Sequence, residues 1–236
     1  DDFVIDYVEK HPNESGIIYC STRKNVNDLQ MKLFKRGVPV TGYHAGLDNS
    51  IRKKSQDDFI YDRAPVVVAT NAFGMGIDKS NVRYVIHYNM PQSMENYYQE
   101  AGRAGRDGER AECILFYSPQ DVRINQFLLE EKEFREEMSG EEIAAVRERD
   151  AQRLKLMTFY GTTRDCLRGY ILRYFGEKTK RRCENCSNCL NEYEEEDVTA
   201  VCRKILTGIR EARRGYGAGT IAGALHGSRS EKIRSY

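Results

Sequence analysis

The stretch PVVVAT at residues 65–70 is apolar at consecutive positions rather than at alternating ones. Such a run is typical of a strand covered on both faces, as in a parallel sheet flanked by helices. Similar short runs recur at residues 16–20, 38–43, 82–88 and 113–117. Amphipathic segments separate them at residues 25–36, 49–61 and 93–101, and Ser118-Pro119 marks a further helix start. This alternation predicts an α/β fold with an open parallel sheet.

The composition of the chain excludes several classes of protein. Its 236 residues carry 37 Lys+Arg against 36 Asp+Glu, and 40% are apolar, as in a globular protein of one or two domains. No run of 18 apolar residues is present, which excludes a transmembrane helix, and we expect no membrane partner. The first residues, DDFV, do not resemble a signal peptide, and we expect a start inside a longer, intracellular protein.

Beyond residue 130 the sheet pattern ends and the charges become unevenly distributed. Residues 130–150 hold nine acidic and four basic side chains, which predicts a solvated helix or a linker. Residues 151–176 have the periodicity of a helical hairpin, with a break at residues 161–163. Residues 164–182 carry seven basic side chains against two acidic ones, so this part is locally positive.

The last part of the chain follows an acidic spacer at residues 192–197 and is helical again. One apolar face is expected from residue 198 on, with further helices near residues 220–225 and 230–236. This stretch is too short to bury a core of its own, which predicts the truncated start of a small helical domain. The domains expected from these patterns are residues 1–130, 131–196 and 197–236.

Four of the seven cysteines have the spacing of a metal site. Cys183, Cys186 and Cys189 form a C-x2-C-x2-C run, and Cys166 precedes it on a predicted helix. Four thiolates, three of them in a tight loop, can close a tetrahedral structural zinc site, and an intracellular chain rarely carries structural disulfides. We therefore predict zinc rather than disulfides at this cluster.

The other cysteines that we considered have structural interpretations. Cys20 and Cys113 lie inside apolar strands and are expected to be buried. Cys202 is an alternative to Cys166 as a zinc ligand, but its apolar neighbours Val201 and Ile205 indicate a core position instead.

The segment QEAGRAGRDG at residues 99–108 places Arg103 and Arg106 three positions apart among small residues. Guanidinium groups presented in this way suit bidentate binding of phosphate and could neutralise charge on a transferring γ-phosphate. An arginine-rich surface turn is the alternative interpretation.

Two further segments place polar groups at the ends of predicted strands, where open α/β sheets bind ligands. In the first, Thr70 offers a hydroxyl to phosphate and Asp78 a carboxylate to a ribose, although a simple glycine turn is the alternative. In the second, Ser21 and Thr22 open a helix and are either phosphate contacts or N-caps. His44 is interpreted as a packed or capping histidine, as His87 is interpreted as structural.

Taken together, these segments resemble a known family. YCSTR at residues 19–23, YHAGL at 43–47, VATNAFGMGIDK at 68–79 and YYQEAGRAGRDG at 97–108 are similar to motifs IV, V and VI of the RecQ family, in helicase superfamily 2. The resemblance continues through YFGE at residues 174–177, the four cysteines, and YGAGT at 216–220, which is similar to the start of the RecQ winged-helix domain.

The resemblance implies an ATP-dependent, 3′-to-5′ DNA helicase with roles in repair and recombination, of which this chain supplies the second RecA-like domain. The implied partners are single-stranded and tailed duplex DNA and the N-terminal RecA-like domain, with structural Zn²⁺ and with ATP and Mg²⁺ as cofactors. The implied compartment is the cytoplasm or nucleoid in a bacterium and the nucleus in a eukaryote.

The resemblance also implies roles for individual residues. Those implied to meet the nucleotide phosphates are Gln99, Arg103 and Arg106, with Arg106 as the arginine finger. Asp78 and Gly76 are implied to lie at the nucleotide, with Asp78 facing the ribose. Those implied to lie toward the backbone of single-stranded DNA are Ser21, Arg23, His44 and Thr70.

One expected part of a motor is missing from the sequence. No G-x-x-x-x-G-K-[ST] segment is present, and no acidic D-E-x-H segment follows a strand. We therefore predict that this chain alone does not hydrolyse ATP at a useful rate. The alternatives are a non-catalytic, zinc-stabilised nucleic-acid-binding module and a different superfamily 2 motor such as an RNA helicase.

Overall fold

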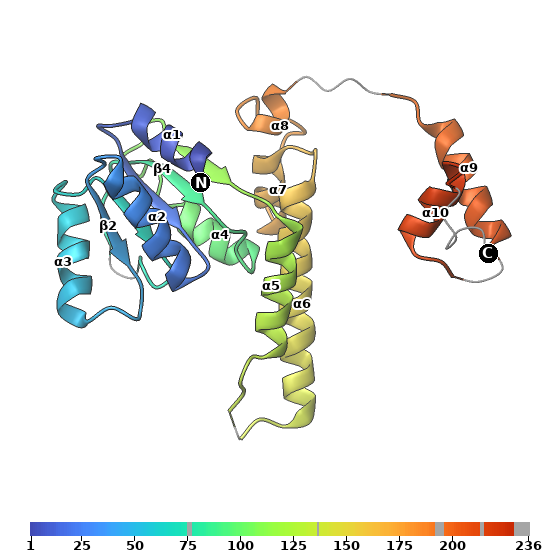
Figure 1. The fold of residues 1–236 in the computed structure, drawn as a ribbon, viewed down its shortest axis with the longest axis horizontal. Helices are drawn as coiled ribbons and strands as arrows, with labels where there is room; N and C mark the ends of the chain where they lie inside the picture. The colour runs from blue at the N-terminus through green and yellow to red at the C-terminus, as the bar shows by residue number, and fades with distance from the viewer. Residues whose placement is uncertain (75–76, 136, 192–195, 213–214, 229–236) are drawn as a thin grey trace. The chain divides into compact units, whose positions relative to one another are not determined.

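The structure is a computed structural model that describes residues 1–74, 77–135, 137–191, 196–212 and 215–228. The chain divides into two compact units, Asp1–Leu190 and Asn191–Tyr236, which are described separately (Figure 1).

The first unit is built on a five-stranded parallel sheet with the strand order β2-β3-β1-β4-β5. Its strands are Ser15–Tyr19 (β1), Val40–Tyr43 (β2), Val66–Ala69 (β3), Val82–His87 (β4) and Glu112–Leu115 (β5). In the central strand, Ile17 pairs with Val67 on one side and with Val85 on the other. All five predicted strands are present, because their apolar runs are covered from both faces of the sheet.

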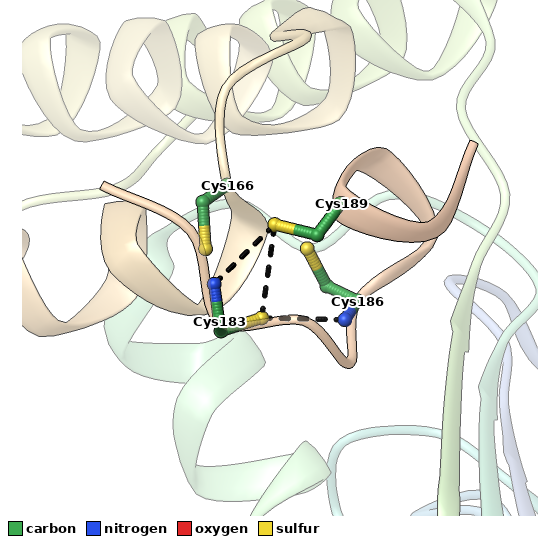
Figure 2. A group of neighbouring side chains, drawn as sticks. All are labelled: Cys166, Cys183, Cys186 and Cys189. Carbon is green, nitrogen blue, oxygen red and sulfur yellow. Dashed lines mark hydrogen bonds between the residues drawn. The ribbon is translucent and has the colours of Figure 1, made fainter. Parts of the chain in front are cut away.

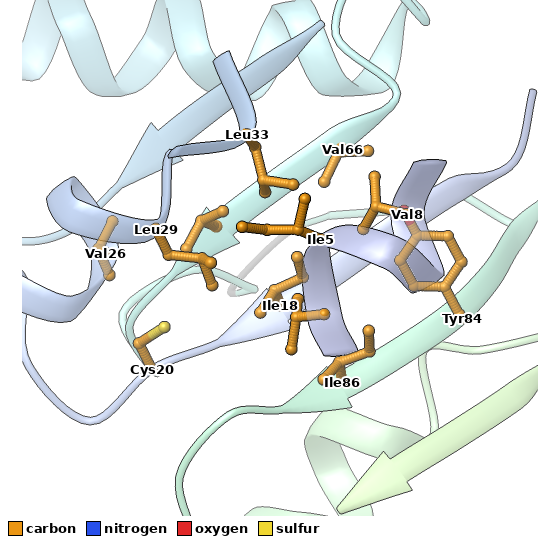
Figure 3. Close-up of a cluster of buried hydrophobic side chains, with 12 residues drawn as sticks. Ile5, Val8, Ile18, Cys20, Val26, Leu29, Leu33, Val66, Tyr84 and Ile86 are labelled. Atoms are coloured by element: carbon orange, nitrogen blue, oxygen red, sulfur yellow. The ribbon is translucent and has the colours of Figure 1, made fainter. Parts of the chain in front are cut away.

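Helices cover both faces of this sheet. One face packs against α1 (Asp2–Lys10) and α2 (Arg23–Lys35), and Figure 3 shows Ile5, Val8 and Leu29 meeting Ile18 and Val66 of the strands. The other face packs against Phe59 of α3 (Asn49–Ile60). α1 is absent from the sequence-based expectations, whereas α2, α3 and α4 (Met94–Ala101) lie where amphipathic segments are predicted.

The helices that follow the sheet form a second layer beside α4. They are α5 (Pro119–Glu130), α6 (Gly140–Thr162), α7 (Leu167–Tyr174) and the short α8 (Ser187–Leu190). Ser118 caps α5 with Pro119 at its first position, as predicted. α6 begins inside the acidic segment, where Ser139 and Glu142 form a reciprocal capping box. The break in the predicted hairpin lies later than expected. Because α6 continues to Thr162 and α7 begins at Leu167, the break comprises residues 163–166 rather than 161–163.

The second unit contains α9 (Thr199–Glu211) and α10 (Ala218–Leu225), which agree with the predicted helical periodicity. The apolar side chains of α9 are exposed, because the described residues of this unit cover little of the helix. The helix expected at residues 230–236 lies outside the described residues. In the described part of the chain, no helix has the length and apolar character needed to cross a membrane.

The structural interpretation holds for one of the three remaining cysteines. Cys20 is buried beneath α2, as expected. Cys113 is exposed, contrary to prediction, because β5 has only β4 as a neighbour and the sheet is open on its other side. Cys202 is also exposed rather than in a core, since it lies on the uncovered helix α9.

Candidate functional site

The four cysteines of the predicted zinc site come together in the structure. The sulfur atoms of Cys166, Cys183, Cys186 and Cys189 all lie within 4.8 Å of one another. Cys166 is the N-cap of α7, and the other three lie in and before α8, as Figure 2 shows. The cluster therefore joins the start of one helix to a loop that follows it in the sequence.

Each of the four sulfurs accepts a hydrogen bond from a backbone N–H. The donors are Gly169 to Cys166 (3.2 Å), Cys186 to Cys183 (3.3 Å), Leu167 to Cys186 (3.3 Å) and Cys183 to Cys189 (3.4 Å). Such donors favour the thiolate, which is the form that binds metal. Burial opposes ionisation of Cys186, but hydrogen bonds from the N–H groups of Leu167 and Cys189 and from the side chains of Cys189 and Cys183 together outweigh it and lower its pKa to about 6. Burial raises the pKa of Cys166 to about 11, so its ionisation depends on the metal itself.

The donor set fits zinc. A tetrahedral site with Zn–S bonds of about 2.3 Å places its sulfurs about 3.8 Å apart. The sulfurs of Cys183 and Cys189 are 3.9 Å apart, and all four cysteines are free rather than joined in disulfides. Four thiolates close a structural site, which leaves no position for a reacting water.

Asn188 supports the cysteine loop, and sequence reasoning does not single it out. Its side-chain amide donates to the carbonyl oxygens of Thr163 and Asp165, at 2.8 Å each. These bonds tie the loop to the linker between α6 and α7. The only sign of this role in the sequence is an asparagine inside the C-x2-C-x2-C run, and asparagine is common in loops of every kind.

The residues predicted to face DNA gather at the carboxyl edge of the sheet. Ser21, His44 and Thr70 follow β1, β2 and β3, which are adjacent in the strand order β2-β3-β1. Ser21 and Arg23 are exposed, and Thr22 caps α2 by accepting the N–H of Asn25 at 3.1 Å. Thr70 is half-buried, and its N–H donates to the carbonyl oxygen of Tyr43 at 3.1 Å.

His44 is buried and engaged within the protein. Its Nδ1 accepts the N–H of Gly46 at 3.2 Å, so Nε2 carries the proton and donates to Oδ1 of Asn27 at 3.1 Å. Burial and the charge of Arg23 lower the pKa of His44, which favours this neutral form. This geometry agrees with the packed-histidine interpretation and leaves neither ring nitrogen for a phosphate. The role of His44 toward DNA stays a prediction.

The two arginines of the QEAGRAGRDG segment have different environments. Arg103 is buried and lies over Gly74, where a Cβ would approach its Nη2 to 2.3 Å. The φ of +137° at Gly74 also favours glycine there. Arg106 is exposed, with its Nε donating to the carbonyl oxygen of Gly102 at 3.3 Å. Arg103 is thus packed inside the turn, with its Nε lacking a hydrogen-bond partner among the described residues, while the side chain of Arg106 is exposed.

The remaining nucleotide-side predictions fall on exposed positions or outside the described residues. Gln99 lies exposed on α4, and Asp78 is exposed after β3. Gly76 lies outside the described residues. Lys79, which follows Asp78 and which sequence reasoning does not single out, is buried and forms an ion pair with Asp62 at 2.7 Å.

A hydrogen-bond network behind Ser21 is also missed by sequence reasoning. The side chain of Asn89 makes two of these bonds. Its Oδ1 accepts the N–H of Ser21 at 3.1 Å, and its Nδ2 donates to the buried carboxylate of Asp121 at 3.0 Å. The other oxygen of Asp121 accepts the N–H of Met90 at 3.1 Å. The loop that carries Ser21 is therefore held by the turn after β4 and by α5.

The structure thus combines a parallel sheet, an arginine-bearing turn between α4 and β5, and a helical module with four clustered cysteines. Three family descriptions match the chain in this order: "Helicase conserved C-terminal domain" over residues 1–108, "RecQ zinc-binding" over 119–190 and "RQC domain" over 192–236. The chain belongs to the RecQ family and corresponds to its C-terminal region.

Two relatives in sequence agree with this assignment. The chain is 41% identical over 233 residues to the ATP-dependent DNA helicase RecQ of Bacillus subtilis, covering 99% of this chain and 38% of that protein. The chain is 38% identical to the protein of the same name from Haemophilus influenzae, and the match covers 96% of this chain and 35% of that protein. The chain thus spans little more than a third of the length of these relatives. The solved C-terminal domain of the DEAD-box protein Dbp5 has a TM-score of 0.46 at 27% identity, covering 56% of this chain and 79% of that domain.

Proposed function

We propose that this chain is the second motor domain and the zinc module (residues 119–190, α5–α8) of an ATP-dependent DNA helicase that moves 3′ to 5′. The observation that carries this proposal is the pair of arginines, one buried and one presented. Arg103 is buried in the turn against Gly74, and Arg106 is exposed on the same turn, between α4 and β5. A fixed turn that presents one guanidinium is what transition-state stabilisation requires.

In this proposal, ATP and Mg²⁺ are bound mainly by a first RecA-like domain joined to this chain in the complete enzyme. Gln99, Arg103 and Arg106 then meet the phosphates from the opposite side, with Arg106 as the finger. Asp78 lies at the nucleotide, with its carboxylate toward the ribose. The exposed positions of Gln99, Arg106 and Asp78 support these roles.

DNA in this proposal runs along the carboxyl edge of the sheet and the positive face of the zinc module. Ser21 and Arg23 are exposed there, and Thr70 offers a hydroxyl beside them. Helix α7, whose N-cap is Cys166, adds Arg168 and Arg173, which are both exposed. Because these contacts are to phosphate, binding should weaken as the salt concentration rises.

Zinc has a structural role in this proposal. The four cysteines hold the start of α7 and the α8 loop together, and the closed ligand set supplies fixed geometry rather than chemistry.

A strand-separation assay tests the proposed function. We expect the complete enzyme, with ATP and Mg²⁺, to separate a DNA duplex that carries a 3′ single-stranded tail, while the same duplex with a 5′ tail stays intact. A non-hydrolysable ATP analogue is the control and should support no separation. Equal separation of both duplexes would contradict the proposed polarity. Tight binding without any separation would favour the non-catalytic module instead.

A further inference from the structure

Helix α4, which leads to the turn with the two arginines, is short. It comprises eight residues, Met94–Ala101, and the turn that bears Arg103 and Arg106 follows it directly. A helix of this length is not stable in isolation, so its position depends on what packs against it. The contacts of α4 therefore decide where the two arginines lie.

Two helices of the zinc module supply much of that packing. Met94 and Tyr97 of α4 are buried in one cluster with Leu154, Met157 and Tyr160 of α6. The hydroxyl of Tyr160 donates to that of Tyr97 at 3.2 Å, and the two rings lie 5.0 Å apart. The apolar face of α4 is therefore completed by residues from beyond the sheet domain.

Polar contacts hold the two ends of α4 from opposite sides. At its carboxyl end, Glu100 pairs at 2.9 Å with Nε2 of the buried His87, which belongs to β4. At its amino end, Oε1 of Glu95 accepts the hydroxyl of Tyr174 at 2.8 Å and pairs with Nε of Arg153 at 3.3 Å. The sheet therefore holds one end, and the zinc module holds the other.

Tyr174 connects this contact to the cysteine cluster. It is the last residue of α7, whose N-cap is Cys166. The first N–H of that helix, from Leu167, donates to the sulfur of Cys186 at 3.3 Å. A single eight-residue helix thus runs from the cysteine sulfurs to the carboxylate of Glu95.

We propose that Tyr174 and Glu95 are positioning residues through which the zinc module sets the orientation of α4, and with it the placement of Arg103 and Arg106 at the nucleotide. The proposal rests on the proposed function. It gives the zinc module a role in ATP hydrolysis that is separate from its contacts with DNA.

Two tyrosines on α7 provide a matched pair of variants. Tyr174→Phe removes the hydroxyl that bonds to α4, whereas Tyr170→Phe removes one that donates to the carbonyl oxygen of Leu156, within the zinc module. Each change deletes one hydroxyl from the same helix. Only the first breaks a contact with the helix that leads to the arginines.

The experiment measures ATP hydrolysis, zinc content and amide hydrogen exchange in the complete enzyme. With Tyr174→Phe we expect kcat to fall about three- to tenfold, since small misplacements of catalytic groups are costly, and KM for ATP to stay unchanged. The amides of residues 102–105 should exchange faster, while zinc content and exchange in the central strands stay as in the wild type. Tyr170→Phe should change neither kcat nor exchange at residues 102–105.

Two results would overturn the inference. Tyr174→Phe with wild-type kcat and wild-type exchange at residues 102–105 would show that the contact does not position α4. Equal losses in both variants would show general loosening of the zinc module. A parallel Arg106→Ala enzyme separates the two proposals: if it keeps full activity, the proposed finger fails, while the exchange data still report whether Tyr174 holds α4.

Discussion

Replacing Arg106 with alanine is expected to lower kcat for DNA-stimulated ATP hydrolysis by about 10³-fold or more, the range typical of an arginine finger. The side chain is exposed, and among the described residues it donates a hydrogen bond to the carbonyl oxygen of Gly102, so we expect its removal to leave the fold intact. In the proposed role, the charge that Arg106 neutralises increases in the transition state, so ATP affinity and DNA affinity should change little. Steady-state hydrolysis with saturating single-stranded DNA, beside equilibrium binding of both ligands, measures the effect.

Arg110→Ala is the matched control for this prediction. Its side chain is 91% exposed and pairs loosely with Glu112 at 3.5 Å, so its loss should leave both stability and kcat unchanged. Arg103→Ala should differ from both, because Arg103 is buried against Gly74 and its removal loosens the turn as well as slowing hydrolysis. An Arg106→Ala enzyme within a few-fold of the wild-type kcat would contradict the assignment of the finger.

Replacing Cys186 with alanine is expected to abolish stable zinc binding and to lower the melting temperature on the order of 10 °C, because structural zinc contributes several kcal/mol to folding. Cys186 accepts the N–H of Leu167 at the start of α7, so this helix should loosen first. The packing of α7 on α4 should weaken with it. Metal analysis and thermal unfolding, each with and without a chelator, measure the two effects.

Cys202→Ala is the control for the cysteine variant. Cys202 is exposed on α9, and the four-cysteine cluster does not include it, so zinc content and melting temperature should match the wild type. A Cys186→Ala chain that keeps its full zinc content and its melting temperature would rule out the cluster as a structural zinc site. Loss of zinc in Cys202→Ala would instead indicate a different ligand set.

The parts of the fold that the sequence predicts are those with strong local patterns. Continuous apolar runs such as residues 65–70 predict the strands, because only a sheet covered on both faces buries every residue of such a run. Helix α1 is absent from the expectations although its sequence favours a helix: Val4, Ile5 and Val8 share one face, and Asp2 lies in the first turn. Cys113 is misplaced because no local pattern distinguishes an edge strand from a central one.

In the candidate site, too, local patterns predict some features, while contacts between distant segments go unpredicted. The spacing of Cys183, Cys186 and Cys189 predicts the cluster, since three ligands lie in one tight loop. The difference between Arg103 and Arg106 does not follow from their spacing. It depends on Gly74, which is distant in sequence and meets Arg103 only in the folded chain. The bond between Tyr174 and Glu95 likewise joins residues 79 positions apart, with no local signal in either segment.

ATP hydrolysis, with and without single-stranded DNA, tests the central claim most directly when the complete enzyme and this chain alone are compared. The account predicts strong, DNA-stimulated hydrolysis by the complete enzyme. It predicts no turnover by the chain alone, because its sequence lacks a G-x-x-x-x-G-K-[ST] segment to hold the phosphates. Turnover by the chain alone, or a complete enzyme that binds DNA but hydrolyses no ATP, would contradict the claim that this chain supplies one half of a two-domain motor.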